Sequence, residues 1–175
     1  NETYKHFKYC EYKEFFKIII KLNGKKFCID NATCSVSNES IIKSFFNITS
    51  YVDPCYMMKS IKNSTEIKNM TKAHIEDGFA LTKFIFWIKN TNKKRITEID
   101  AQNKLEKFRK INKNYLFPSF NTIAGTGSNG AIVHYKTSKK SNKIIKKNDI
   151  FLCDSGGQYK YGTTDVTRTI CFSKQ

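Results

Sequence analysis

Two aspartates near the end of the chain have a spacing that could serve metal chemistry. Asp154 lies in the run IFLCDSGGQY, and Asp165 lies eleven residues further on, in the run GTTDVTRT. A short Lys-Tyr-Gly turn at residues 160–162 separates the two runs, which are rich in β-branched and aromatic residues. Such runs on either side of a tight turn predict one β-hairpin that carries both carboxylates.

The turn also predicts the register of this hairpin. If Lys160 and Tyr161 form a two-residue loop, Asp154 faces Thr167 on the opposite strand. Asp165 lies two residues before Thr167, and side chains alternate along a strand, so both aspartates project from the same face. We therefore expect them to be diagonal neighbours, roughly 7–8 Å apart at the backbone.

Two carboxylates on one sheet face repel each other, and a bound cation removes that repulsion. The spacing therefore suits metal ligands, but it also suits solvated hairpin residues, because Asp is common near turns. A bulge at Gly156-Gly157 would shift the parity and separate the two side chains. Spacing alone leaves these alternatives open.

The amino-acid sequence of the hairpin also resembles that of a known enzyme family. DSGGQY followed by GTTDVTRT resembles the metal-binding hairpin of aminopeptidase P, the Xaa-Pro aminopeptidase branch of the pita-bread metallopeptidases. SFNTIAGTGSNGAIVHY is similar to the segment just upstream in these enzymes, and residues 59–81 and 97–109 resemble two of their helices. The resemblance runs in order from residue 59 to 172, and GTTDVTRT favours aminopeptidase P over prolidase or methionine aminopeptidase.

The resemblance implies a role for three residues. Asp154 would chelate one metal ion and Asp165 would bridge two. His134, in GAIVHY, would lie beside the metals and contact the substrate without being a direct ligand. A single His in a predicted strand is, by its chemistry alone, more often structural. The implied cofactor is two divalent metal ions, with Mn²⁺ favoured because oxygen ligands suit hard cations.

The chemistry implied by the resemblance is hydrolysis with two metal ions. Two divalent cations roughly 3.5–4 Å apart lower the pKa of a bridging water and polarise the scissile carbonyl. The hydroxide would attack the amide bond between an N-terminal residue and a following proline, while His134 stabilises developing charge. Thr167 and Arg168 follow Asp165 and would support the site. The implied partners are peptides with proline second, and the implied assembly is a homodimer.

The ligand set in this chain is incomplete. The family completes its site with one His and two Glu from further downstream, but no His follows His134 and no Glu follows Glu106 here. We therefore expect a piece of an enzyme that is inactive alone, with the missing ligands beyond residue 175. Tyr161 also stands where the family often has Asp, at a solvent-side turn position.

Two sections are expected along the chain. Residues 1–58 alternate helix and strand, and we assign them to the C-terminal part of a non-catalytic α/β domain. Residues 59–175 are assigned to the N-terminal half of an α+β pita-bread catalytic domain. In the first section we expect a helix ending near Asn23-Gly24, a strand KKFCID, a helix capped by Ser37 and reaching Phe46, and a strand ITSYVD.

The second section has two marked helix starts. Asn63 with Glu66, and Thr97 with Asp100, have the spacing of capping boxes. An apolar stripe from Ile67 to Ile88 predicts a first helix of more than twenty residues. His74 lies on this helix, where a surface contact is favoured over a metal role. SFNTIAGTGSNGAIVHY reads as a hairpin or bulged pair of strands.

The formal charge is +16 and the sequence pI about 9.6, which would permit binding to nucleic acids or anionic membranes. However, the lysines are spread along the chain without a nucleic-acid motif, so we expect solvated lysines and no nucleic-acid partner. The cluster at residues 136–147 predicts an extended, exposed connector. No apolar run approaches the ~18–20 residues of a membrane span, so no membrane partner is expected.

Cysteine usage bears on the compartment. The six cysteines form no C-x-x-C pair and no Cys/His cluster with zinc spacing. Reduced buried thiols are therefore expected, consistent with a cytoplasmic enzyme. The function predicted is an Xaa-Pro aminopeptidase, a metal-dependent hydrolase in the full-length protein. The alternatives are a non-catalytic pita-bread binding protein and, supported only by charge, a basic nucleic-acid-binding module.

Overall fold

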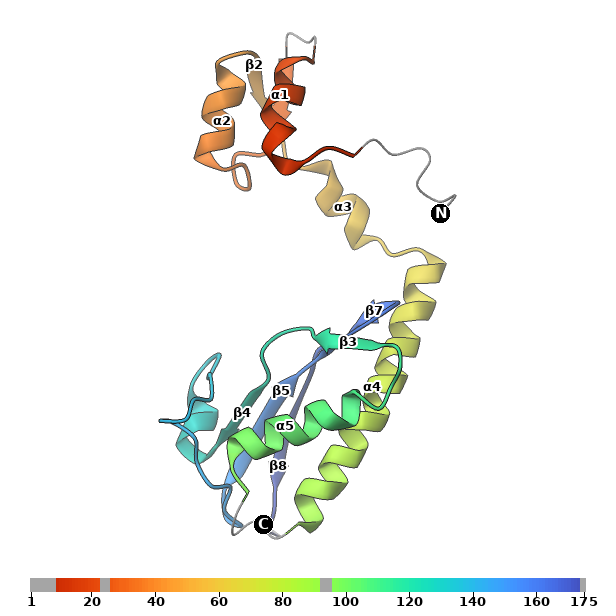
Figure 1. Cartoon of the computed structure of the whole chain (residues 1–175), viewed down its shortest axis with the longest axis vertical. Coiled ribbons are helices and arrows are strands. Elements are labelled where there is room, and N and C mark those ends of the chain that lie inside the picture. The colour runs from red at the N-terminus through yellow and green to blue at the C-terminus, as the bar shows by residue number, and fades with distance from the viewer. Residues whose placement is uncertain (1–8, 23–25, 92–95, 174–175) are drawn as a thin grey trace. The chain divides into compact units, whose positions relative to one another are not determined.

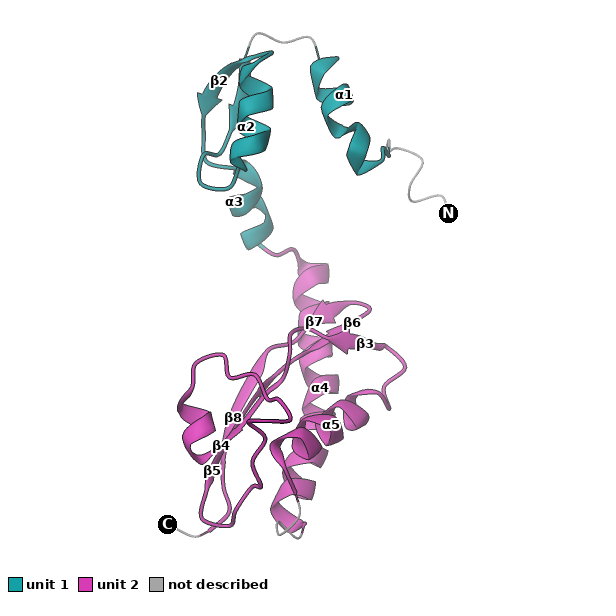
Figure 2. Cartoon of the chain, turned by 60° about the vertical axis from the view of Figure 1, so that its left-hand side comes forward, with its two compact units in different colours: residues 1–61 teal, residues 62–175 magenta. Residues whose placement is uncertain are grey.

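The structure is a computed structural model that describes residues 9–22, 26–91 and 96–173 (Figure 1). The chain divides into two compact units, Asn1–Ile61 and Lys62–Gln175 (Figure 2). The division falls between two helices, and each unit has its own buried cluster. The two units are therefore described separately.

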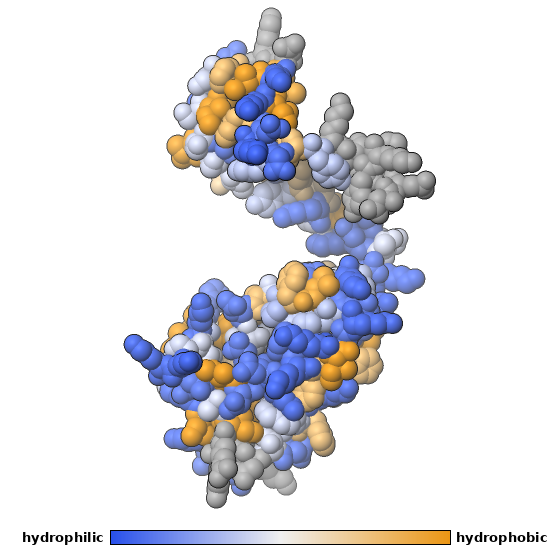
Figure 3. Space-filling model, viewed as in Figure 1, coloured by the Kyte–Doolittle hydropathy of each residue, from blue (hydrophilic) through white to orange (hydrophobic). Residues whose placement is uncertain are grey.

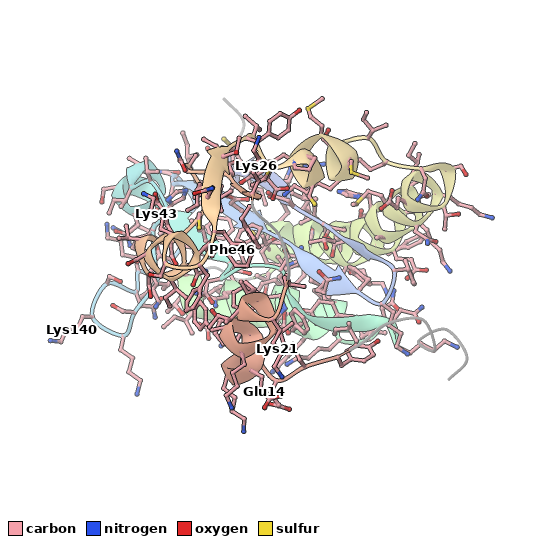
Figure 4. All side chains as sticks on the ribbon, turned by 90° about the horizontal axis from the view of Figure 1, so that it is seen from above. Glu14, Lys21, Lys26, Lys43, Phe46 and Lys140 are labelled. Carbon is pink, nitrogen blue, oxygen red and sulfur yellow. The ribbon has the colours of Figure 1, made fainter. Side chains whose placement is uncertain are left out.

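The first unit contains a small parallel sheet with helices packed beside it. Its elements are η2 (Tyr12–Glu14), α1 (Phe15–Ile20), β1 (Lys26–Ile29), α2 (Val36–Lys43), β2 (Asn47–Ser50) and α3 (Pro54–Ser60). β1 and β2 pair in parallel. Ile19, Ile29, Ile42 and Phe46 form the core, while Lys26 and Lys43 project outward (Figure 4).

The predicted cap of α2 is wrong by two residues. Ser35, not Ser37, is the N-cap, and its hydroxyl accepts a hydrogen bond from the Asn38 amide at 3.2 Å. The chain leaves the preceding turn at Cys34, whose amide donates to the Asp30 carbonyl, so Ser35 is the first residue free to cap. The helix also ends at Lys43, before Phe46, which packs in the core of the unit.

The second unit has two long helices and two antiparallel sheets of three strands. Its helices are α4 (Ser64–Asn90), α5 (Glu98–Arg109) and the 3₁₀ helix η4 (Gly127–Ala131). Its strands are β3 (Tyr115–Pro118), β4 (Ile123–Thr126), β5 (Ile150–Ser155), β6 (Gly157–Tyr159), β7 (Gly162–Thr163) and β8 (Val166–Cys171). The strand orders are β4-β5-β8 and β3-β6-β7.

Both predicted capping boxes are confirmed. Asn63 and Glu66 bond each other's backbone amides at the start of α4, and Thr97 and Asp100 do the same at α5. Each box satisfies helix amides that would otherwise lack an acceptor. The two helix starts therefore lie where the sequence places them.

The main core lies between the two helices and one face of the β4–β5–β8 sheet (Figure 1). Phe84 of α4 and Phe151 of β5 are fully buried, with ring centroids 6.4 Å apart. The expected apolar stripe of α4 is only partly buried, since Ile67 is 56% exposed while Ile88 is fully covered. The reason is that the β4–β5–β8 sheet covers α4 only beyond Ala80. The first turns of α4 extend past the main core.

The hairpin has the predicted register. Tyr159 pairs with Gly162, and Asp154 pairs with Thr167. No bulge shifts the parity at Gly156, because the same register holds on both sides of it. A Cβ at Gly156 would lie 1.9 Å from the Thr164 carbonyl oxygen, so only glycine fits at this position of the hairpin.

The segment SFNTIAGTGSNGAIVHY is not the predicted hairpin. Its first half forms β4, which pairs with β5, and its second half forms η4 and turns. Gly125 packs on Gly130 so closely that a Cβ on Gly125 would lie 2.9 Å from the Gly130 Cα. The glycines thus allow the chain to fold back on β4 without a second strand, and His134 lies outside any strand.

The lysine-rich connector is exposed at its tip but is held at its base. Lys140 points away from the unit (Figure 4). Ile145 is fully buried, and its amide donates to the Ile96 carbonyl at 2.9 Å. Burial of one apolar residue and pairing with the start of α5 outweigh the repulsion that predicted an extended connector.

Polar residues cover most of the face shown in Figure 3, with smaller apolar patches between them. Among the described residues, no helix has the length and hydropathy needed to cross a membrane. The six cysteines are free thiols, but the expectation that they are buried is wrong for Cys10, Cys28 and Cys55, which are exposed. Cys153 is buried, and burial raises its pKa to about 11.

Candidate metal centre

A pocket of about 440 Å³ opens on the face of the β4–β5–β8 sheet that α4 and α5 do not cover. Its walls come from three parts of the second unit: the segment around β4, the turn after η4, and the β5–β8 hairpin. The lining residues are Phe120, Asn121, Ile123, His134, Tyr135, Lys136, Asp154 and Asp165. The structure thus brings together all three residues singled out in the sequence.

Asp154 is half-buried near the end of β5, where it faces Ile123 on one side and Thr167 on the other. The Thr167 hydroxyl donates to Asp154 Oδ1 at 2.8 Å. Asp165 is exposed and lies between β7 and β8, and no donor in the described part of the chain contacts its carboxylate. Both acids are therefore available to a cation in the pocket.

His134 is exposed and has a φ of 53°, in the left-handed region that non-glycine residues seldom adopt. The strain is held by its neighbour Tyr135, which is buried, while the imidazole reaches the pocket. Strained backbone of this kind is common where a side chain must point in one particular direction.

A buried acid at the start of α5 holds the segment that carries His134. Glu98 is fully buried, and its Oε1 accepts from the Thr126 amide at 2.8 Å and from Asn129 Nδ2 at 3.0 Å. Its Oε2 accepts from the Tyr135 hydroxyl at 2.9 Å and from the Lys143 amide at 3.1 Å. Glu98 therefore ties β4, η4 and the turn at His134 to the first turn of α5.

A second buried network lies on the helix side of the hairpin. The Arg109 guanidinium donates from Nε to Asp77 Oδ1 at 2.7 Å and from Nη2 to Asp77 Oδ2 at 3.0 Å. Both side chains are 1% exposed. Burial alone would raise the pKa of Asp77, but the hydrogen bonds and charge of Arg109 outweigh it and hold that pKa below its ordinary value.

Sequence reasoning missed this pair, although a signal exists. Asp77 lies four residues after Ala73 and four before Leu81, so it falls within the buried stripe of α4. Arg109 likewise lies four residues after the buried Leu105 of α5. Opposite charges on the apolar faces of two adjacent helices predict a buried ion pair, because an unpaired charge there would be very unfavourable.

The pocket supplies some of the oxygen ligands that a divalent cation needs, but not a full set. Asp154 and Asp165 supply carboxylate oxygens, which hard cations prefer. Within the described residues, no group of three or more His, Cys, Asp or Glu side chains could hold a metal ion. The pocket thus contains two candidate ligands, Asp154 and Asp165. His74 is not among its lining residues, and its Nδ1 contacts the Met70 carbonyl on the surface of α4.

A larger hollow of about 630 Å³ lies between α4 and α5 but offers no comparable chemistry. Its lining is mainly apolar, around Phe86, Trp87 and Phe108, with Lys83 as its charged residue. It contains neither an acid nor a histidine. The smaller pocket at the hairpin is therefore the candidate site.

Comparisons with known proteins place this pocket in context. The chain is 48% identical over 119 residues to a probable Xaa-Pro aminopeptidase P of Sordaria macrospora, covering 66% of this chain and 19% of that protein. A crystal structure of an X-prolyl aminopeptidase of Caenorhabditis elegans, described as a cytosolic enzyme with a di-nuclear active site, matches at a TM-score of 0.68. That match is 31% identical and covers 78% of this chain and 22% of the other.

The fold of this chain also matches other solved structures. An Xaa-Pro dipeptidase of Bacillus anthracis matches at a TM-score of 0.72 and 26% identity, over 90% of this chain and 43% of the other. These matches confirm a mixed helix and sheet fold that forms part of a pita-bread catalytic domain. The metallopeptidase family M24 pattern matches residues 68–175, and the chain belongs to this family.

Proposed function

We propose that this chain forms part of a metal-dependent Xaa-Pro aminopeptidase. The enzyme would hydrolyse the amide bond between an N-terminal residue and a following proline. The observation that carries the proposal is the convergence of Asp154, Asp165 and His134 on one pocket. Family membership and the names of the relatives support the choice of reaction.

In this proposal Asp154 and Asp165 hold two divalent cations, with Mn²⁺ the favoured metal. When bound, the cations supply an activated hydroxide and polarise the scissile carbonyl. The chain spans about a fifth of the length of the Sordaria relative, so the remaining ligands would come from elsewhere in the complete protein. The expected ligands are one His and two Glu.

The other residues of the pocket bind and orient. Thr167 fixes the Asp154 carboxylate through the hydrogen bond to Oδ1. The imidazole of His134 donates a hydrogen bond to the substrate where negative charge develops. Phe120 and Ile123 add apolar surface to the same pocket, against which a proline ring can pack.

The competing functions have less support. A non-catalytic pita-bread protein has no need of two acids in one pocket, yet both are present. A nucleic-acid-binding module would rest on the charge of +16 alone. The homodimer and the cytoplasmic location remain proposals, the latter supported by the description of the C. elegans relative as cytosolic.

The place of the first unit is also a proposal. We assign residues 1–58 to the C-terminal part of the non-catalytic α/β domain, and residues 59–175 to the N-terminal half of the catalytic domain. The division of the chain after Ile61 and the parallel pairing of β1 with β2 support this assignment.

The test uses the complete protein with Asp165→Asn and Asp154→Asn. Metal content is measured by mass spectrometry, and hydrolysis is compared on peptides that differ only in having proline or alanine second. Both variants should lose bound metal and essentially all activity. Asp149→Asn is the control, because this carboxylate accepts from Thr126 and Lys146 outside the pocket. Full activity in Asp165→Asn would refute the proposal.

A further inference from the structure

We propose that the buried Asp77–Arg109 pair is a positioning device that sets the distance and direction of Asp154 and Asp165 from the opposite side of the hairpin. The proposal rests on the proposed function, since it assigns those two acids to a metal centre. It adds two residues that lie on helices and are not among the residues that line the pocket.

The contacts of the pair reach the immediate neighbours of both acids. Arg109 Nη2 donates to Ser155 Oγ at 3.0 Å, and Ser155 directly follows Asp154. The Thr164 hydroxyl donates to Asp77 Oδ2 at 3.0 Å, and Thr164 directly precedes Asp165. One ion pair therefore holds one neighbour of each candidate ligand.

Alternation along the strands explains why these contacts direct the acids. Successive side chains point to opposite faces, so a Ser155 side chain that points to the helices turns Asp154 toward the pocket. Thr164 and Asp165 lie outside the strands but have the same arrangement, since Thr164 contacts Asp77 while Asp165 lines the pocket. Ser155 and Thr164 are both fully buried, whereas Asp165 is exposed. A backbone shift at Ser155 or Thr164 would also shift the adjacent carboxylate.

The anchoring is concentrated where the hairpin ladder is interrupted. Asp165 lies in the gap between β7 and β8, so it is outside the regular strand pairing. There the Thr164 hydroxyl is shared between Asp77 and the Gly157 amide, which donates to it at 2.9 Å. The Thr164 carbonyl accepts from the Ser119 hydroxyl at 2.8 Å. Thr164 thus carries much of the alignment of Asp165.

Stability alone does not account for a charge pair at this position. Replacing a buried ion pair by apolar residues is often neutral or stabilising, because two charges must lose their hydration. Within the described residues, Arg109 Nη1 is buried without a hydrogen-bond acceptor. The pair instead provides a defined orientation, because a planar guanidinium binds a carboxylate through two parallel hydrogen bonds. This geometry fixes α4 and α5 relative to the hairpin.

The experiment measures Mn²⁺ affinity of the complete protein by titration calorimetry, well below the melting temperature of each variant. Thr164→Val keeps the side-chain volume but removes the hydroxyl, and Arg109→Lys keeps the charge but removes the two-bond geometry. Both should weaken Mn²⁺ binding by about tenfold or more. Thr164→Ser restores the hydroxyl and should bind nearly as the parent does.

The control is Ile88→Ala, which removes packing from the buried face of α4 outside this network. It should lower the melting temperature while leaving Mn²⁺ affinity unchanged. If folded Thr164→Val binds Mn²⁺ as the parent does, or if Ile88→Ala weakens binding equally, the positioning role is wrong. If Arg109→Lys fails to fold, the two Thr164 variants decide the question. A parent protein without Mn²⁺ binding would refute the proposed function and this inference with it.

Discussion

Thr167 stands directly opposite Asp154 in the β5–β8 pair and donates a 2.8 Å hydrogen bond to its Oδ1. The bond ties the orientation of the carboxylate to the register of the hairpin. No donor in the described residues contacts Oδ2, so this oxygen remains available on the pocket side. Asp165 lines the same pocket as Asp154, which the proposed metal centre requires.

His134→Ala should separate metal binding from turnover. The imidazole lies in the pocket but is proposed to contact substrate rather than metal, so bound metal should stay near the parent level. Loss of one donor to a transition-state charge should lower kcat by roughly 10²–10³-fold. Kinetics and metal analysis on the complete protein check this. His74→Ala is the matched control, since that imidazole lies on the surface of α4. Loss of metal from His134→Ala would contradict the assignment.

Glu98→Gln should loosen the segment that carries His134. The amide nitrogen of Gln cannot accept a hydrogen bond, so donors now bonded to one Glu98 oxygen would be left buried and unpaired. The expected cost is about 1–3 kcal/mol of unfolding free energy. Chemical denaturation measures it. Because His134 moves with this segment, kcat should also fall; an unchanged kcat would show that Glu98 has no effect on the pocket.

The stabilisation from Asp77 should depend on pH in the acid range. The folded-state pKa of this carboxyl lies below its unfolded value of about 3.9. The folded protein therefore binds this proton less readily, so the stabilisation is present above about pH 4 and is lost as the pH falls below it. Asp77→Asn should be destabilising at pH 7, and the difference from the parent should shrink below pH 4. Denaturation curves between pH 3 and 7 test this, and a difference independent of pH would contradict it.

Gly156→Ala should be strongly destabilising. The added methyl would lie 1.9 Å from the Thr164 carbonyl oxygen and 2.2 Å from Ser119 Oγ, so the strands must move apart beside both acids. Gly78→Ala is the control, because a Cβ there meets nothing within 4 Å and α4 is a regular helix. That change should stabilise by roughly 0.5–1 kcal/mol. Thermal melting compares the two variants, and similar melting temperatures would show that the close contact at Gly156 can relax at little cost.

Local rules in the sequence were enough to predict the hairpin and the starts of α4 and α5. The turn at residues 160–162 and the alternation of side chains specify which residues face each other, since both act over a few residues. The capping boxes at Asn63 and Thr97 are equally local. The register and both caps are confirmed.

Other parts depend on contacts that are distant in the sequence. The segment before His134 reads as a pair of strands because glycines and Asn129 separate two strand-like runs. Contacts to Glu98, 28 to 37 residues away, instead hold it as η4 and a turn. The connector after it is anchored by Ile145 against the start of α5. Such tertiary contacts override local preference, and one sequence does not reveal which distant residue supplies them.

The hairpin and the buried network differ in the sequence separation of their hydrogen bonds, and this difference bears on the order of folding. Asp154 and Thr167 are 13 residues apart, whereas Asp77 is 82 residues from Tyr159 and 87 from Thr164. Closing a long loop loses more chain entropy than closing a hairpin, so local pairs form more readily. We expect the hairpin to close first and the docking of α4 on it, through Asp77, to be among the last steps. The two acids would then acquire their final alignment only when the chain has finished folding.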